Sequence, residues 1–206
     1  MKSLWYPDCN FESLFIPHIL KEIYIDKVFA KLKPCNVIMD VGANIDLTAM
    51  YLKDFGKMVY AIEPATEHYS ALLKNTYENQ WNNVLCYNMA ISDKNCTCSL
   101  FLNDQNRTMN SLVWNTGKGE TVRCVTFAQF MTENHIEEID FCKLDVEGAE
   151  EAILLGEGFT SVCKSIKSLL VEFHSLQHTA LLLHMKNLGY NYYPIPANSM
   201  LYWFER

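Results

Sequence analysis

The residues best suited to chemistry in this sequence are carboxylates that directly follow short apolar runs. Asp40 ends one such run and precedes a turn that contains Gly42 and Asn44. Glu63 ends the next run. A glycine in such a turn lets the backbone approach a ligand closely, and an acid about 20 residues after the first strand accepts the two hydroxyls of a ribose. An exposed loop glutamate is the alternative for Glu63, but the two acids together predict a nucleotide site.

A second acidic group follows the apolar run that contains Lys143. It consists of Asp145, Glu147 and Glu150. Like charges at the end of a strand raise one another's pKa or require a cation, which Lys143 supplies in part. Asp145 or Glu147 can act as a general base toward a hydroxyl or bind a hard divalent metal. The alternative is an acidic helix N-terminus, and we prefer that interpretation for Glu150 alone.

Two further pairs of polar residues stand near the ends of apolar runs. Glu172 and His174 form one pair, at a position where open α/β sheets bind ligands, although a structural histidine is equally expected there. Ser92 and Asp93 form the other pair. They are expected near a nucleotide base, or Asp93 simply begins a turn.

Alternating strands and helices must position these residues. An apolar run, a glycine turn and apolar residues at helical spacing predict strand, turn and helix over residues 37–52. Further strands are expected at 58–62, 84–90, 139–144 and 168–174, and helices at 66–79, 126–134, 152–155 and 177–187. Two extra strands, at 98–102 and 120–126, flank a polar loop at 103–119 that contains Arg107, Asn110, Ser111 and Trp114. A hairpin over residues 190–204 completes an α/β fold.

The length of 206 residues fits one α/β domain with a modest addition. We expect residues 1–34 to form a helical segment that packs on the domain, and residues 35–206 to form the domain itself. The segment is interpreted either as a wall of the substrate pocket or as a cover for a sheet edge.

The net charge of −7, with 17 Lys and Arg residues spread thinly, predicts no binding to nucleic acid. No apolar stretch reaches the length of a membrane span, and no secretory signal opens the sequence. We therefore expect a cytoplasmic protein with reduced cysteines. Cys96 and Cys98 alone stand close together among the eight cysteines, and a single C-x-C pair is weak evidence for zinc.

Five sequence blocks resemble the FkbM family of S-adenosylmethionine-dependent methyltransferases. They read D-V-G-A-N at 40–44, A-I-E-P at 61–64, A-I-S-D at 90–93, F-C-K-L-D-V-E-G-A-E at 141–150 and V-E-F-H at 171–174. The resemblance implies a class I methyltransferase fold. That fold is a Rossmann-like three-layer sandwich around a mostly parallel seven-stranded sheet with a C-terminal antiparallel hairpin. The implied reaction is O-methylation of a hydroxyl on a small molecule or sugar.

The resemblance also assigns roles to the residues above. It places Asp40, Gly42 and Asn44 at the methionine end of the cofactor. Glu63 binds the ribose, and Ser92 and Asp93 flank the adenine. Asp145, Glu147 and His174 are the implied catalytic residues, and they face the methyl acceptor together with Glu172. Metal-dependent relatives of similar fold make Asp145 and Glu172 a candidate pair of ligands for Mg²⁺.

One residue departs from the family pattern, because Asp46 replaces the last glycine of G-A-N-x-G. An aspartate there adds bulk and negative charge beside the cofactor. This departure keeps open a second hypothesis, a catalytically degenerate methyltransferase fold that binds a partner. A nicotinamide-dependent oxidoreductase is a third, and it is disfavoured because D-x-G-x-N is a poor pyrophosphate loop compared with G-x-G-x-x-G. The acceptor and the oligomeric state are not predicted.

Overall fold

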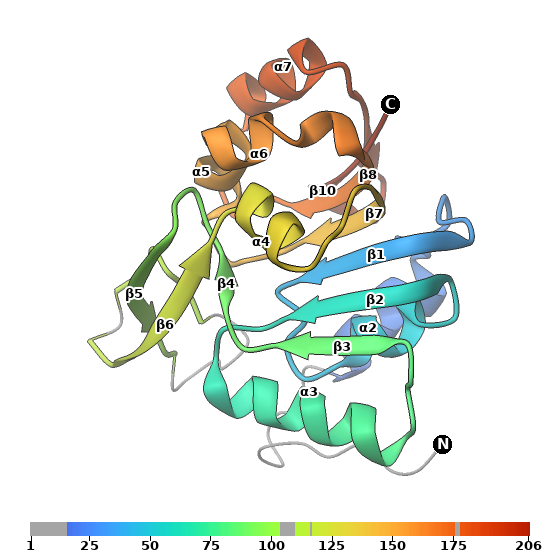
Figure 1. Cartoon of the computed structure of the whole chain (residues 1–206). Helices are drawn as coiled ribbons and strands as arrows, with labels where there is room; N and C mark the ends of the chain where they lie inside the picture. Colours follow the sequence, from blue (N-terminus) through green and yellow to red (C-terminus); the bar gives the residue numbers. More distant parts are fainter. Residues whose placement is uncertain (1–15, 104–109, 116, 176–177) are drawn as a thin grey trace.

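The computed structural model describes residues 16–103, 110–115, 117–175 and 178–206 (Figure 1). Its main sheet has seven strands in the order β3-β2-β1-β7-β8-β10-β9. Their bounds are β1 Cys35–Val41, β2 Gly56–Ile62, β3 Val84–Tyr87, β7 Ile139–Leu144, β8 Ile166–Glu172, β9 Asn191–Ile195 and β10 Asn198–Glu205. Only β10 runs antiparallel to its neighbours β8 and β9. The predicted fold class, including the terminal hairpin, is confirmed.

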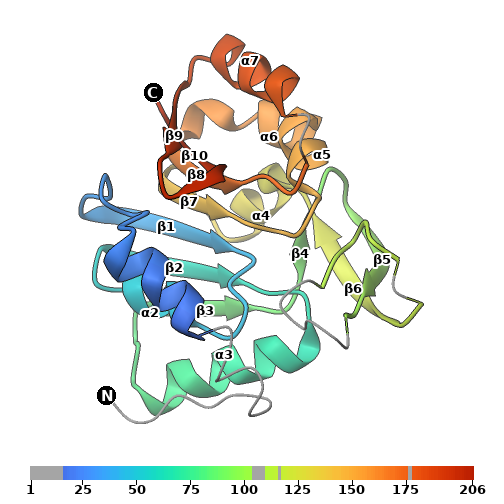
Figure 2. The ribbon, with the colours of Figure 1, turned by 180° about the vertical axis from the view of Figure 1, so that it is seen from behind.

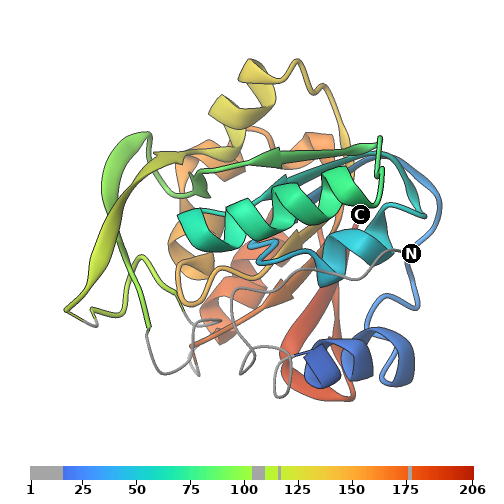
Figure 3. The ribbon, with the colours of Figure 1, turned by 90° about the horizontal axis from the view of Figure 1, so that it is seen from below.

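Helices cover both faces of this sheet, as the view from below shows (Figure 3). One face carries α4 (Phe127–Glu133), α5 (Glu150–Leu155), α6 (Glu157–Thr160) and α7 (Thr179–Asn187). The other face carries α2 (Leu47–Leu52) and α3 (Thr66–Glu78). Alternate residues along each strand supply the two cores, so that Cys142 packs on the first face and Phe141 on the second.

A second, three-stranded sheet in the order β4-β6-β5 projects from the carboxyl edge of the first (Figure 1). It consists of β4 Ala90–Ile91, β5 Cys96–Phe101 and β6 Gly119–Val125. The single strand predicted at 84–90 is therefore wrong. The chain leaves the main sheet after Tyr87, because the Asn88 side chain donates to the carbonyl oxygens of Glu63 and Pro64 and Ala90 then pairs with Cys124 of β6.

The N-terminal part of the described chain is helical from residue 16 and ends in the π-helical turn η1 (Lys21–Ile25). It lies on the same face of the sheet as α2 (Figure 2). Phe29, which follows it, stacks on Tyr51 and meets the edge of Phe141. Among the residues described here, no helix combines the length and apolar character needed to cross a membrane.

Candidate functional site

The carboxyl ends of β1 and β7 bring the two predicted acidic groups together. Asp40 and Lys143 are partners in the parallel register of these strands. The Lys143 Nζ lies 3.0 Å from Asp145 Oδ2 and 3.8 Å from Asp40 Oδ1. Burial raises the pKa of Asp40 to about 6, and the positive charge of Lys143 limits the rise. Lys143 therefore supplies positive charge to both acids. The sequence had indicated this role only for the group that contains Asp145.

Gly42 is required here by the protein's own backbone. Its φ is +82°, and a Cβ at this position would lie 1.8 Å from the carbonyl oxygen of Asp145. The sequence predicted that this glycine lets a ligand approach. The structure shows a separate requirement, because glycine lets the turn after β1 pack against the turn after β7, and the ligand role stays a prediction.

Glu63, at the end of β2, holds the turn after β1 in place. Its carboxylate accepts hydrogen bonds from the backbone N–H groups of Asn44 at 2.9 Å and Ala65 at 2.8 Å. Burial raises the pKa of Glu63 to about 7, although these two bonds oppose the shift. A carboxylate offers about four lone pairs, so Glu63 retains capacity for further donors such as ribose hydroxyls.

The turn also contains buried oxygens that lack donors. Within the described part of the chain, both carboxylate oxygens of Asp40 and the Oδ1 of Asn44 have no hydrogen-bond partner. Buried polar atoms are nearly always satisfied, so such atoms mark a place where a ligand's donors fit. An amino group would suit them, which is the chemistry expected at the methionine end of the cofactor.

His174 stands at the centre of a second cluster. Its Nδ1 donates to Glu150 Oε1 at 2.9 Å, and its Nε2 lies 3.3 Å from Glu147 Oε2 and 3.8 Å from Asp145 Oδ1. Burial lowers the pKa of His174, but the Glu150 hydrogen bond and the charge of Asp145 outweigh it and raise the pKa to about 9. Burial and the neighbouring Asp145 raise the pKa of Glu147 to about 8.

Glu150 was interpreted from the sequence as a helix-end acid only, and the structure shows more. Its side chain is buried, and besides His174 it accepts the N–H groups of Val146 and Gly148. It thus closes the turn after β7 and orients the imidazole at the same time. No local pattern could reveal this contact, because His174 is brought to Glu150 by the pairing of β7 with β8.

Two residues of the polar loop predicted at 103–119, Ser111 and Trp114, also contact this cluster. The Trp114 ring meets His174 edge-on with centroids 5.9 Å apart. Ser111 Oγ donates to the Glu147 carbonyl oxygen at 2.6 Å. Gly148, with φ +106°, leaves room for the Trp114 ring, which a Cβ would approach to 3.0 Å. Arg107, noted in the same loop, lies outside the described residues.

Glu172 belongs to a neighbouring arrangement. It accepts a hydrogen bond from Asn198 Nδ2 at 3.2 Å, and burial, Asp145 and Glu22 raise its pKa to about 7. The described side chains at this edge whose ligand atoms lie within 4.8 Å of one another are Asp145, Glu150 and His174. Glu172 is not among them, and Lys143 supplies positive charge at Asp145. The structure therefore gives no support to Mg²⁺ at Asp145 and Glu172.

Ser92 and Asp93 lie where β4 leaves for the second sheet. The Ser92 N–H donates to the Val125 carbonyl oxygen, and its hydroxyl donates to Asp93 Oδ1. The Cα of Asp93 lies beside Gly156, at the junction of α5 and α6. The adenine role of this pair remains a prediction.

Asp46 occupies a backbone conformation that suits glycine. Its φ is +129°. The side chain is fully buried, and neither carboxylate oxygen has a hydrogen-bond partner of good geometry among the described residues. Burial raises its pKa to about 8, an effect that the nearby Asn75 amide only partly offsets. Burial raises the pKa of Cys86 on β3, and the nearby Asp46 adds to this rise.

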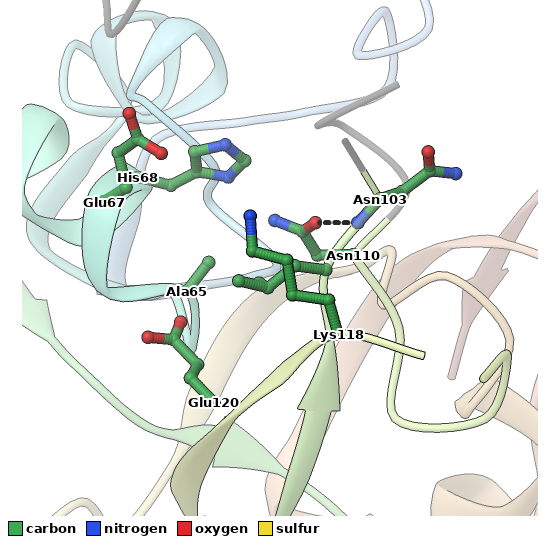
Figure 4. A pocket seen from close by; sticks show the side chains of 8 residues that line it. Ala65, Glu67, His68, Asn103, Asn110, Lys118 and Glu120 are labelled. Atoms are coloured by element: carbon green, nitrogen blue, oxygen red, sulfur yellow. Dashed lines mark hydrogen bonds between the residues drawn. The ribbon is translucent and has the colours of Figure 1, made fainter. Parts of the chain in front are cut away.

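A small pocket opens between the start of α3 and the β5–β6 loop (Figure 4). It is lined by Ala65, Glu67, His68, Leu102, Asn103, Asn110, Lys118 and Glu120. His68 also approaches Glu63, with Nδ1 3.9 Å from Oε1. The cavity volume of about 80 Å³ is enough for a few water molecules at about 30 Å³ each.

Comparison with protein families assigns residues 40–192 to the methyltransferase FkbM domain. No curated protein sequence matches the chain. The matched region contains all of the acidic and histidine residues discussed above except Glu22.

Several solved structures share the fold at low sequence identity. The FkbM methyltransferase from Methylobacillus flagellatus KT is 15% identical with a TM-score of 0.54, over 84% of this chain and 44% of that one. TrmK from M. capricolum, solved with S-adenosyl-homocysteine, is 15% identical with a TM-score of 0.52, over 88% of this chain and 66% of that one. An rRNA methylase from Streptococcus thermophilus is 10% identical with a TM-score of 0.54, over 88% of this chain and 93% of that one.

Proposed function

The chain belongs to the FkbM methyltransferase family, and from this premise we propose that it transfers a methyl group from S-adenosylmethionine to a hydroxyl of a small molecule or sugar. The observation that carries the proposal is the His174 cluster. It holds an imidazole oriented by Glu150, with Nε2 directed at two carboxylates, beside a turn that contains unpartnered buried oxygens. This arrangement combines a proton acceptor with a place for a cofactor.

The residues of the turn after β1 fit the cofactor that the family implies. Asp40 and Asn44 have buried oxygens that can accept from the amino group of the methionine end, and Glu63 can accept from the ribose. When bound, S-adenosylmethionine supplies a methyl group on a positively charged sulfur. The acidic surroundings of Asp40, Asp145 and Glu172 complement that positive charge.

The protein's own task is to position the acceptor and remove its proton. In its neutral form, His174 can take the proton of an acceptor hydroxyl at Nε2. Glu150 fixes the tautomer through Nδ1, and Asp145 and Glu147 stabilise the imidazolium that results. Trp114 provides an apolar wall that helps to hold the acceptor in line with the methyl group.

A small acceptor fits the overall charge better than RNA does. The net charge of −7 opposes binding to a phosphate backbone. The structurally similar proteins include an rRNA methylase, but at 10% identity the likeness shows the fold alone. RNA methylation would therefore be a contrary outcome of an acceptor screen.

A degenerate fold that binds a partner without turnover is the second candidate. It is favoured by Asp46, whose strained backbone and buried carboxyl group without hydrogen-bond partners lie in the turn that should hold the cofactor. Cofactor binding distinguishes the two candidates directly.

The experiment is calorimetric titration of the chain with S-adenosylmethionine and S-adenosylhomocysteine, with NADH as the negative control. We expect both sulfur compounds to bind. Glu63→Ala should weaken their binding at least about tenfold, because the two hydrogen bonds that the Glu63 carboxylate would accept from the ribose hydroxyls are lost. Glu63→Gln serves as a milder variant should Glu63→Ala unfold. Glu137→Ala, an exposed acid, is the matched control and should bind like the native chain.

Folding of each variant is checked by circular dichroism. Failure of the folded native chain to bind either compound would overturn the methyltransferase proposal and favour the degenerate fold. Binding that is unaffected by both Glu63 variants would instead refute the assigned ribose contact.

A further inference from the structure

Three cysteines meet on one face of the second sheet, away from the residues used above. Cys96 and Cys98 alternate with the exposed residues Thr97 and Ser99 along β5, so both point to the inner face. Cys124 on β6 is the register partner of Cys96. Only the C-x-C pair is visible in the sequence, because the third thiol arrives through strand pairing.

The three thiols are close enough to share a ligand. Their Sγ atoms all lie within 4.8 Å of one another, and all three cysteines are free. Cys124 is buried, whereas Cys96 and Cys98 are half-buried, so the group can be reached from one side. Burial raises the pKa of Cys124, and the neighbouring Cys98 and Cys96 raise it further.

We propose that Cys96, Cys98 and Cys124 form a binding site for a soft closed-shell cation, with Zn²⁺ as its expected occupant. Thiolates are the ligands that such cations prefer. Tetrahedral zinc with Zn–S bonds of about 2.3 Å places sulfur atoms about 3.8 Å apart, so the thiols need to move by less than about 1 Å. On binding, three S–H groups lose their protons to solvent, three Zn–S bonds form, and a water molecule completes the tetrahedron.

Two simpler roles account for the cluster less well. Cysteine is a common small apolar residue, and these three do border a small core with Leu100 and Val122. The other buried cysteines, Cys142 and Cys163, fill that role without forming such a cluster among the described side chains. A disulfide would use two of the three sulfurs and leave the third unexplained.

The position of the site suggests what the cation does. The end of β5 is linked to Ser111 by reciprocal backbone hydrogen bonds between Phe101 and Ser111. Ser111 in turn bonds to the turn that carries Glu147. A cation that fastens β5 to β6 would therefore stabilise the strand pair that supports the loop over His174.

The test is a titration of the fully reduced, full-length chain with Cd²⁺, in which the thiolate-to-metal charge-transfer absorption reports binding. Zn²⁺ is then added as a competitor. We expect an endpoint at one equivalent per chain, displacement by Zn²⁺, and release of protons into a weakly buffered solution. Cys98→Ser removes one ligand and should weaken binding at least about 100-fold, since loss of even an outer-shell partner costs 10–100-fold. Cys96→Ser should weaken Cd²⁺ binding to a similar degree.

Cys86→Ser is the matched control, because Cys86 is also a half-buried free cysteine but lies on β3. It should bind Cd²⁺ like the native chain. The proposal is overturned if the reduced native chain shows no charge-transfer band, or if Cys96→Ser and Cys98→Ser, shown folded by circular dichroism, bind as tightly as Cys86→Ser. Binding that requires none of the three cysteines would have the same consequence.

Discussion

Asp46 combines two unfavourable features at one position, a glycine-like backbone and a buried carboxylate without a good partner. Its φ of +129° is outside the region that residues with a Cβ readily adopt. Strain of this kind costs about 1–3 kcal/mol per residue. The residue therefore lowers stability at the turn where the cofactor is proposed to bind.

We predict that Asp46→Gly raises the free energy of unfolding at pH 8 by roughly 1–3 kcal/mol, because the strain is relieved. Urea denaturation measures this. Asp46→Asn keeps the shape and the strained backbone but removes the charge, so it separates the two contributions. A native chain as stable as Asp46→Gly at pH 8 would contradict the argument.

The same residue predicts a pH dependence with a definite sign. Burial raises the pKa of Asp46 from an ordinary 3.8 to about 8, so the folded state retains a proton that the unfolded chain releases. The stability linked to this proton is fully present below pH 4 and is lost as the pH rises to about 8. The stability gained by Asp46→Asn over the native chain should therefore grow across this window. A gain that is constant with pH would show that the pKa of Asp46 is not raised in the folded state.

At the scale of elements, the important contact joins the start of α5 to the segment after β8. Glu150 orients His174 and raises its pKa, so that the imidazole is mostly protonated at neutral pH. A general base must be neutral to accept a proton. The methyl transfer rate should therefore rise with pH until about 9.

We predict that Glu150→Gln moves this rise to lower pH by about one unit, since the negative partner is lost. In the proposed mechanism Glu150 positions His174, whereas a purely structural role of Glu150 would lower the rate without moving the pH profile. The measurement is the pH profile of methyl transfer once an acceptor is found, or the titration of His174 by NMR before then. Glu151→Gln, an exposed neighbour on α5, should leave the profile unchanged.

At the scale of the whole molecule, the described N-terminal residues pack into the core of the domain. Ile23, Val28, Phe29 and Leu32 are buried in the same cluster as residues of β1, α2 and β7. Lys31 adds an ion pair with Glu205 of β10. We therefore propose that residues 16–34, the described part of the segment predicted at residues 1–34, unfold together with the domain at 35–206.

Phe29→Ala tests this proposal. It should lower the free energy of unfolding by about 3–5 kcal/mol in a single transition, because it removes a buried ring that contacts Tyr51 and Phe141. Circular dichroism and tryptophan fluorescence should report the same midpoint. Ile25→Ala, at an exposed position, should change stability by less than about 0.5 kcal/mol. An early separate transition, with the main one unchanged, would show that the segment folds independently.

The sequence by itself determined the family, the fold class and the strand ends at which acids cluster. These follow from local signals, namely apolar runs of strand length, a glycine turn and the blocks around Asp40, Glu63 and Asp145. Parallel strands place their carboxyl ends at one edge, so alternation of elements was sufficient to predict that the acids at these strand ends lie along the same edge of the sheet. The predicted site roles themselves await the titrations and variants described above.

Only the tertiary structure decided the contacts between residues far apart in the chain. Strand pairing brought His174 to Glu150, Cys124 to the Cys96–Cys98 pair, and Lys143 between Asp40 and Asp145. It also showed that Gly42 faces the Asp145 backbone and that Asp46 points into the protein. The physical reason is that periodicity specifies which residues share a face of one element. Which faces then meet depends on the register and packing of elements that are distant in the sequence.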